Sequence, residues 1–468
     1  MTKTALILAA GQGTRMKSKI PKVLHQMAGR TMLSHVIRAA RGAGIDQSIV
    51  IVGHGAEQVT EATAEPGMVF VHQREQLGTG HAVMVAEHAI PEEGILLVLC
   101  GDTPLITKET LTEFMDFHER EGNTLSVLTA IFENPYGYGR IVKDEAGGLL
   151  KIVEEKDADE ETKAIREINS GIYCFDAAAL KKNLSRITNN NAQKEYYLTD
   201  LVEIAVGQKE KTGAYPVRDQ DEIMGVNTRV QLAAAAEIMR TRICREHMLA
   251  GVTMIDPKGV YIDMDVTIGR DTVIYPGAIL QRGTEIGESC IIGQNCRIEN
   301  SVIGNETEIQ SSTIIDSRVG NHTSVGPYAY LRPKSEVGDH VKIGDFVEVK
   351  NASIGDGSKA SHLSYIGDAD VGKDVNVGCG VVFVNYDGVN KFRSTIEDEA
   401  FVGSNSNLVA PVHVGKRGYI AAGTTVTKTV PEGSLYVGRA KERVIPNWGE
   451  KKMKEKKEKN HVKQSSRK

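Results

Sequence analysis

The sequence lacks a membrane span, a signal peptide and a disulfide framework, the features that mark membrane and secreted proteins. No apolar run approaches the roughly 18 residues that a membrane span needs, and Met1 leads directly into a strand-like segment without a signal peptide. The six cysteines are scattered, with neither CxxC pairs nor the spacing of a disulfide framework. We therefore expect a cytoplasmic protein that does not insert into membranes.

Aromatic residues are scarce, at 5% of the chain, whereas glycine is abundant, at 47 of 468 residues. The net charge of −5 argues against general nucleic-acid binding. Nine Lys and Arg against two Glu give residues 451–468 a charge of +7, which leaves −12 on the rest. Such a charge run is typical of a disordered end, and we assign this tail no role.

The first 228 residues alternate short aliphatic runs with helix-like stretches. The runs at 4–11, 48–53, 68–73 and 95–102 are nearly continuous, as in buried parallel strands. This pattern predicts a Rossmann-like α/β fold, with its ligand crevice at the carboxyl ends of the strands.

Beyond Gly251 the hydrophobic period changes to six residues, which fits neither an amphipathic helix nor a half-buried strand. It indicates hexapeptide repeats in a parallel β-helix, whose aliphatic residues point inward. These positions are Ile268, Ile274, Leu280, Ile286, Ile292, Ile298, Ile303, Ile309, Ile315, Val319, Val325, Leu331, Val337, Ile343, Val349, Ile396, Val402, Leu408, Val414, Ile420 and Val426.

The change of period divides the chain. We predict an α/β domain at 1–228, a helical linker at 229–249, a β-helix at 250–445 and a disordered basic tail at 446–468. The linker contains neither Gly nor Pro and carries an apolar stripe through Leu232, Ala236, Met239 and Ile243.

A glycine-rich loop follows the first predicted strand, in LAAGQGTRM at 8–16. It matches neither the dinucleotide-binding fingerprint, because Met16 replaces the last glycine, nor a Walker A loop. Arg15 and Lys22 follow closely and could neutralise charge on a transferring phosphoryl group. Asp102 ends a buried strand and could hold Mg²⁺ against phosphates, or could equally cap the next helix.

These motifs in this order resemble the sugar nucleotidyltransferase family over about the first 228 residues. The resemblance implies phosphate contacts from Lys22 and Arg15, which would act catalytically, and a metal site at Asp102 and Asn227. It also implies nucleotide or sugar binding by Leu8, Ala9, Ala10, Gly11, Lys22, Gln73, Gly78, Thr79, Gly139, Glu154, Asn169 and Asn227.

Polar residues become dense in the β-helix between about 330 and 440, where an insertion near 384–395 interrupts the repeat. A His in a β-helix is often only a polar surface residue. His362, however, has Lys350 and Tyr365 nearby in sequence, and a His that titrates near neutrality can take the proton of an attacking amine.

From Thr4 to about Ile445 the chain resembles the bifunctional bacterial enzymes that make UDP-N-acetylglucosamine. The resemblance implies glucosamine-1-phosphate acetylation by acetyl-CoA, uridylyl transfer from UTP with Mg²⁺, and a role in supplying cell-wall precursor. It also implies that the β-helix is left-handed and that the protein is a homotrimer. His362 would be the general base. Arg332, Lys350, Tyr365 and Asn376 would bind the amino sugar phosphate, and Cys379, Asn385, Tyr386, Ser404, Ala422 and Arg439 would bind acetyl-CoA.

Cys379 departs from the small Ala common in that family, and we expect it to pack rather than react. Two alternatives stay open. One is a single-activity sugar-1-phosphate nucleotidyltransferase, making for example ADP-glucose or GDP-mannose, whose β-helix regulates or oligomerises. The other is a non-catalytic assembly protein built on the solenoid.

Overall fold

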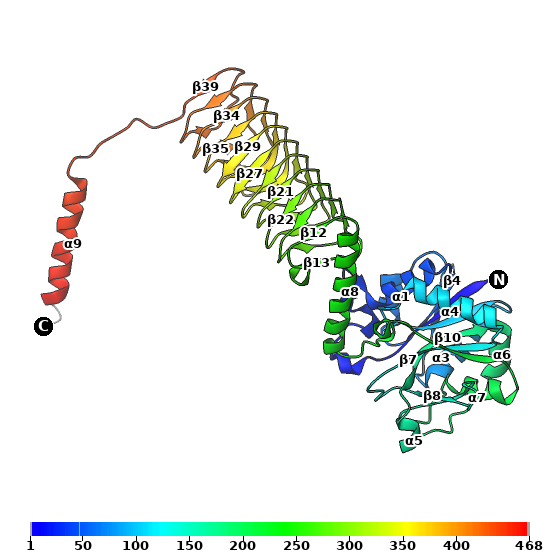
Figure 1. Cartoon of the computed structure of the whole chain (residues 1–468). Coiled ribbons are helices and arrows are strands. Elements are labelled where there is room, and N and C mark those ends of the chain that lie inside the picture. Colours follow the sequence, from blue (N-terminus) through cyan, green and yellow to red (C-terminus); the bar gives the residue numbers. More distant parts are fainter. Residues whose placement is uncertain (1, 46, 466–468) are drawn as a thin grey trace. The chain divides into compact units, whose positions relative to one another are not determined.

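The computed structural model describes residues 2–45 and 47–465, with side chains up to residue 460. The chain divides into two compact units, Met1–Thr284 and Glu285–Lys468. The first contains a mixed α/β sheet, the linker helix and the first strands of the solenoid. The second contains the remaining strands and a terminal helix (Figure 1).

The sheet of the first unit runs in the order β11-β7-β10-β6-β1-β4-β5. Four of its strands are parallel and follow the predicted aliphatic runs: β1 (Lys3–Ala9), β4 (Gln47–Val52), β5 (Met68–His72) and β6 (Ile95–Cys100). The long strand β10 (Glu167–Asp176) is antiparallel to β6 and to β7 (Leu125–Ile131). The sheet is completed by β11 (Thr212–Pro216), and β8 (Arg140–Lys143) and β9 (Leu149–Val153) form a hairpin beside β10.

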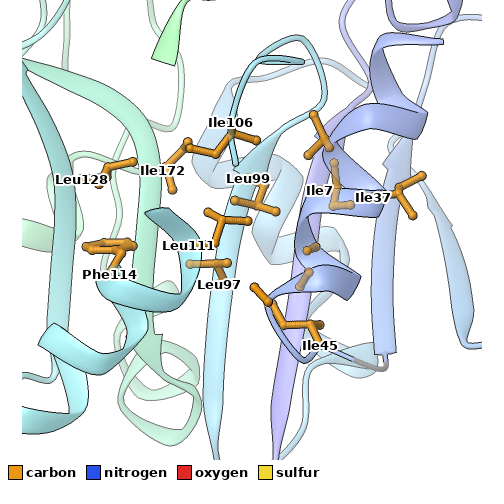
Figure 2. Packing of buried hydrophobic residues seen from close by; sticks show 14 of the residues in the cluster. Ile7, Ile37, Ile45, Leu97, Leu99, Ile106, Leu111, Phe114, Leu128 and Ile172 are labelled. Carbon is orange, nitrogen blue, oxygen red and sulfur yellow. The ribbon is translucent and has the colours of Figure 1, made fainter. Parts of the chain in front are cut away.

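Helices cover both faces of this sheet, so alternate residues of each strand enter different cores. Ile7 and Leu97 face α1 (Met32–Gly42) and α4 (Lys108–Glu121), as Figure 2 shows. Leu6 and Leu96 face the opposite core, with α3 (Thr79–Val85), α6 (Ala177–Leu184) and α7 (Asp200–Gly207). Double coverage explains why the strands read as continuous apolar runs.

Helix α8 (Arg229–Leu249) occupies the predicted linker range, and the Thr228 hydroxyl caps its start by accepting from the Gln231 N–H. Met239 and Ile243 of the predicted stripe are buried, with Ala235 and Cys244 beside them. After it, β12 (Thr253–Met254) pairs with β15 (Val273–Ile274), and β13 (Tyr261–Ile262) pairs with β16 (Ile279–Leu280).

The second unit contains most of the parallel β-helix that the six-residue period predicts. Short parallel strands such as β21 (Glu308–Ile309), β24 (Ser324–Val325) and β27 (Lys342–Asp345) stack in successive coils (Figure 1). The predicted aliphatic positions are buried, with two exceptions. Ile268 is only half-buried.

Ile315 is the second exception, and here the prediction of an inward side chain is wrong. In β22 (Thr313–Ile315) the middle residue, Ile314, is buried, because it lies in register with Ile298 below and Leu331 above. The spacing of the aliphatic positions shortens by one residue between Ile298 and Ile303. The parity of a strand decides which side chains face the core, so an error of one residue in placing such a shift reverses the assignment.

The basic tail also differs from expectation. Residues Trp448–Ser465 form helix α9 instead of a disordered segment. Lys and Glu are good helix formers, and the ion pair of Lys452 with Glu455, 2.8 Å apart, supports the helix locally.

Candidate functional sites

A cleft of about 370 Å³ opens where β1 and β6 end at their carboxyl termini. Leu8 and Cys100 are paired there, and the Gly101 N–H donates to the Leu8 carbonyl at 2.9 Å. This is where a parallel sheet places its ligand crevice. The cleft is lined by Leu8, Ala9, Ala10, Gly11, Lys22, Val23, Gln73, Gln76, Gly78, Thr79, Ala82, Cys100, Asp102 and Glu195.

Nine of these lining residues belong to the set predicted from sequence, and five do not. Gln76 was missed although its amide donates to the Ala10 carbonyl at 2.7 Å and so supports the glycine-rich loop. Glu195 was missed because it comes from a segment far along the chain that carries no motif. Val23, Ala82 and Cys100 are apolar or weakly polar, so no residue-type signal identifies them.

Glycine is required at two positions, one in the glycine-rich loop and one in the cleft lining. Gly13 has φ +62°, and a Cβ there would lie 2.6 Å from the Lys22 Cβ. Gly78 has φ +113°, and a Cβ there would lie 2.5 Å from the Tyr196 carbonyl oxygen. The first glycine lets the loop approach Lys22, and the second lets the start of α3 pack beside Tyr196.

Three polar side chains meet at one edge of the cleft. Lys22 forms an ion pair with Asp102 and donates to the Asn227 amide oxygen at 3.1 Å. The Val226 N–H donates to the Asp102 carbonyl at 2.9 Å, which anchors the segment that carries Asn227. Asp102 does not cap the next helix, because α4 is capped by Thr107.

This edge fits a divalent cation. It offers a carboxylate and an amide oxygen, the donor types that Mg²⁺ prefers when phosphates and water complete its shell. A positive charge is already accommodated there, that of the Lys22 ammonium. Among the described residues no group of three or more His, Cys, Asp or Glu could hold a metal by itself, so any ion here would depend on substrate oxygens.

Arg15 lies on the short 3-10 helix at Thr14–Met16, where it is exposed, and it is absent from the cleft lining. The neighbouring Met16 is buried and anchors this turn. The structure therefore brings Lys22 into the cleft and leaves Arg15 at the surface.

Gly139, Glu154 and Asn169 converge beside the β8–β9 hairpin, outside the residues that line the cleft. The Asn169 N–H donates to the Gly139 carbonyl at 2.9 Å. A Cβ on Gly139 would lie 3.4 Å from Glu154 Oε1. Burial and the neighbouring acids, Asp157 first, raise the pKa of the Glu154 carboxyl.

Asp200 belongs to the same acidic group. Burial, followed by repulsion from Glu203 and Asp157, raises the pKa of the Asp200 carboxyl to about 6. Glu195 lines the cleft and is also one of the acids that raise the pKa of Glu154. Carboxyl groups therefore extend from the cleft to the acidic group around Glu154 and Asp200.

A second set of predicted residues meets on the solenoid. Lys350 lies on β28 (Glu348–Ile354) and Tyr365 on β30 (Tyr365–Val371), in neighbouring coils. Arg332 forms an ion pair with Glu348 at 2.7 Å, and Glu348 is in register with Tyr365. The predicted Arg332, Lys350 and Tyr365 are thus held together by strand pairing.

The insertion adds residues to this cluster that sequence reasoning missed. The neighbouring Lys350 ammonium lowers the pKa of Lys391, which places two cations side by side. Asn385 donates to Asp368, and its amide lies 3.4 Å from the Tyr365 hydroxyl. Lys391 and Asp368 give no motif by themselves, and only the return of the insertion to the coils makes them neighbours.

His362 ends β29 (Lys359–His362), and its Nδ1 lies 2.7 Å from Asp345 Oδ1. Asp345 was also missed. The hydrogen bond from the His362 ring lowers the pKa of the Asp345 carboxyl.

Cys379, Ser404 and Ala422 form a column on successive coils. A Cβ on Gly378 would lie 2.6 Å from the Ser404 N, and one on Gly403 would lie 2.5 Å from the Ala422 N. All three column residues are exposed, so a ligand could reach them.

The remaining predicted residues are more dispersed. Asn376 lies on β31 (Asn376–Val377), one coil above Lys359. The Tyr386 hydroxyl donates to the Gly388 carbonyl within the insertion. Arg439 is exposed beyond β39 (Leu435–Tyr436), and the structure does not bring it to the other residues.

Comparisons with known proteins match both parts of the chain. Residues 5–161 match a family model described as a MobA-like NTP transferase domain, and residues 260–354 match the GMPPB C-terminal domain. Over its full length the chain is similar to curated proteins named Bifunctional protein GlmU. That of Clostridioides difficile (strain 630) is 57% identical over 97% of this chain and 98% of its own length. That of Alkaliphilus oremlandii (strain OhILAs) is 60% identical over 97% and 99%.

No helix in residues 2–45 and 47–465 is long and apolar enough to cross a membrane.

Proposed function

The chain belongs to the GlmU family of bifunctional enzymes, and we propose which of its residues carry each of the two activities. It transfers an acetyl group from acetyl-CoA to glucosamine-1-phosphate, and then a uridylyl group from UTP to N-acetylglucosamine-1-phosphate. The product is UDP-N-acetylglucosamine, a peptidoglycan precursor. The single-activity and non-catalytic alternatives are not favoured.

Uridylyl transfer takes place in the cleft of the first unit. The nucleotide lies against Leu8, Ala9, Ala10 and Gly11 and is held further by Gln73, Gly78 and Thr79. A phosphate oxygen of the sugar phosphate bonds to the α-phosphorus of UTP while the bond to the departing pyrophosphate breaks. Lys22 stabilises the charge that spreads over the phosphoryl oxygens, and no protein nucleophile is needed.

One observation carries this assignment: Lys22, Asp102 and Asn227 meet beside the glycine-rich loop. Asp102 and Asn227 would hold Mg²⁺, which when bound neutralises phosphate charge. Gly139, Glu154 and Asn169 bind the sugar, and their proximity to one another supports that grouping. Arg15 contacts the outer phosphates, for which its exposed turn must move towards the cleft.

Acetyl transfer takes place on the solenoid, with His362 as general base. Arg332, Lys350, Tyr365 and Asn376 bind the amino sugar phosphate, and the adjacent Lys391 adds a second cation for the phosphate group. Acetyl-CoA is bound by Cys379, Asn385, Tyr386, Ser404, Ala422 and Arg439, with Cys379 packing rather than reacting.

A homotrimer completes the acetyl-transfer site. Tyr328, Phe346 and Leu363 form an exposed apolar column on successive turns, and the Tyr328 and Phe346 rings stack at 5.4 Å. The column adjoins Asp345 and His362 in sequence, so a second copy packed on it would shield the base from water. This supports a site shared between chains.

The activities then divide at the predicted boundaries. Residues 1–228 carry uridylyl transfer, 229–249 link the domains, 250–445 carry acetyl transfer and 446–468 form the basic tail. We place the enzyme in the cytoplasm, where its co-substrates UTP and acetyl-CoA are available and its six free thiols would stay reduced.

Mass spectrometry of one reaction tests the assignment. The full chain is incubated with glucosamine-1-phosphate, acetyl-CoA, UTP and Mg²⁺, and beside it the variants Asp102→Ala and His362→Ala. We expect Asp102→Ala to accumulate N-acetylglucosamine-1-phosphate, and His362→Ala to convert only N-acetylglucosamine-1-phosphate that is supplied. Loss of both activities in either variant, or of neither, would contradict the assignment of residues to two separate sites.

A further inference from the structure

Asp345 and His362 occupy equivalent positions on neighbouring coils of the solenoid. Strand β27 pairs in parallel with β29, and the register sets Asp345 opposite His362. Asp345 Oδ1 and His362 Nδ1 are 2.7 Å apart, the separation of a charge-assisted hydrogen bond. The pairing of β27 with β29 thus fixes the backbone of both residues in this contact.

This contact selects one tautomer of the ring. An ionised carboxylate accepts hydrogen bonds but cannot donate one, so the proton of the contact belongs to Nδ1. The lone pair of a neutral ring then lies on Nε2. The lowered pKa of the Asp345 carboxyl, caused first by this hydrogen bond, keeps the carboxylate ionised near neutral pH.

We propose that Asp345 is a positioning residue for acetyl transfer, which holds His362 in the tautomer whose Nε2 removes the proton of the attacking amine. The inference rests on the proposed role of His362 as general base. The amine nitrogen bonds to the acetyl carbon and the C–S bond of acetyl-CoA breaks. The amine proton passes to Nε2, and the imidazolium returns it to the departing CoA thiolate. The carboxylate stabilises the imidazolium between these transfers.

The pair contributes to the reaction more than to the fold. In the single chain 59% of the His362 side chain and 38% of the Asp345 side chain are exposed, and exposed ion pairs add little to stability. The other charged group acting on Asp345 is Lys342, on its own strand. The titratable groups on the adjoining strands β28 and β30 are Glu348, Lys350, Tyr365, Asp368 and Asp370.

Kinetics of the full-length enzyme test the role. Asp345→Ala removes the carboxylate, and Asp345→Asn keeps an oxygen that can accept from Nδ1. We expect kcat for acetyl transfer to fall about 10- to 100-fold in Asp345→Ala, as for other residues that orient a functional His, and less in Asp345→Asn. The KM for acetyl-CoA should not change, because Asp345 is not placed at that substrate.

The split between kcat and KM, together with partial rescue by Asp345→Asn, separates positioning from a structural defect. Glu306→Gln is the matched control, because it removes a carboxylate 3.3 Å from Nδ1 of His322 on the same solenoid. This variant should keep wild-type kinetics.

The possible outcomes distinguish a failure of the inference about Asp345 from a failure of the proposed function. Wild-type kcat in both Asp345 variants, with His362→Ala inactive, would overturn the inference and leave the proposed function intact. Undiminished acetyl transfer in His362→Ala would contradict the proposed function itself. Uridylyl transfer and sedimentation of the same preparations report folding and assembly, and a loss of acetyl transfer that merely follows dissociation would also overturn the positioning role.

Discussion

Gly78 offers a sharp test of how the backbone builds the nucleotide cleft. Its φ of +113° strains any L-residue, and a Cβ would also lie 2.5 Å from the Tyr196 carbonyl oxygen. With ψ at 175° the backbone lies in a region essentially restricted to glycine, which costs about 1–3 kcal/mol for another residue, and the overlap costs about 1–3 kcal/mol more. Gly78→Ala should therefore destabilise the first unit by about 2–6 kcal/mol.

Gly147 provides the matched control. It has a comparable φ of +83°, but a Cβ there would meet nothing within 4 Å. Gly147→Ala should thus incur only the cost of a positive φ, about 1–2 kcal/mol, so a larger loss in Gly78→Ala reports the overlap with Tyr196 together with the more restricted backbone there.

Scanning calorimetry measures the difference. At about 2–4 °C per kcal/mol for a large domain, Gly78→Ala should lower the unfolding temperature of the first unit by about 4 °C or more. It should also raise the KM for UTP, because a shift of α3 moves Thr79 in the cleft. Equal unfolding temperatures for Gly78→Ala and Gly147→Ala would refute the reasoning, since they would show that Tyr196 yields without cost.

Three further perturbations have distinct expected outcomes. Lys22→Met should lower uridylyl transfer by about 10²–10³-fold, as the loss of one charge-stabilising donor does, while acetyl transfer continues; equal losses in both assays would contradict separate sites. Burial lowers the pKa of His118 to about 4, below its usual value near 6.5, so stability should fall as pH drops from about 6.5 to 4. His118→Gln should remove about 3 kcal/mol of this pH-dependent loss in the free energy of unfolding, measured by denaturant unfolding at each pH; an unchanged pH dependence would show that His118 is not the cause. For the proposed trimer, Phe346→Asn should give monomers in sedimentation, because it removes an exposed ring of the apolar column at φ +58°, a conformation that Asn tolerates; sedimentation of this variant as a trimer would exclude the column from the interface.

Most of the fold was predictable because its signals are local. The aliphatic runs became the parallel strands β1, β4, β5 and β6, and the six-residue period became the solenoid. Two predictions failed for physical reasons. Ile315 was assigned inward because the six-residue period does not show the strand parity after the spacing shifts by one residue. The tail became α9 because its Lys and Glu residues favour helix as much as solvation.

The sites were predictable only where a motif carried them. The glycine-rich loop, Lys22 and Asp102 appear in the cleft lining, whereas Gln76 and Glu195 had no signal. Asp345 shows the limit most clearly. Three six-residue repeats make a coil of about 18 residues, which would set Gly344 beside His362. The coil there is 17 residues long, so Asp345 is the neighbour.

The sequence by itself determined the two folds, the family and the order of the two chemistries, because periodicity and motif content are properties of short segments. Only the tertiary structure decided which distant side chains meet. Lys22 reaches Asp102 across 80 residues and Asn227 across 205, because adjacent strands end at the same edge of the sheet. Strand register, which depends on the length of every coil and connection, sets these contacts and cannot be read from any one segment.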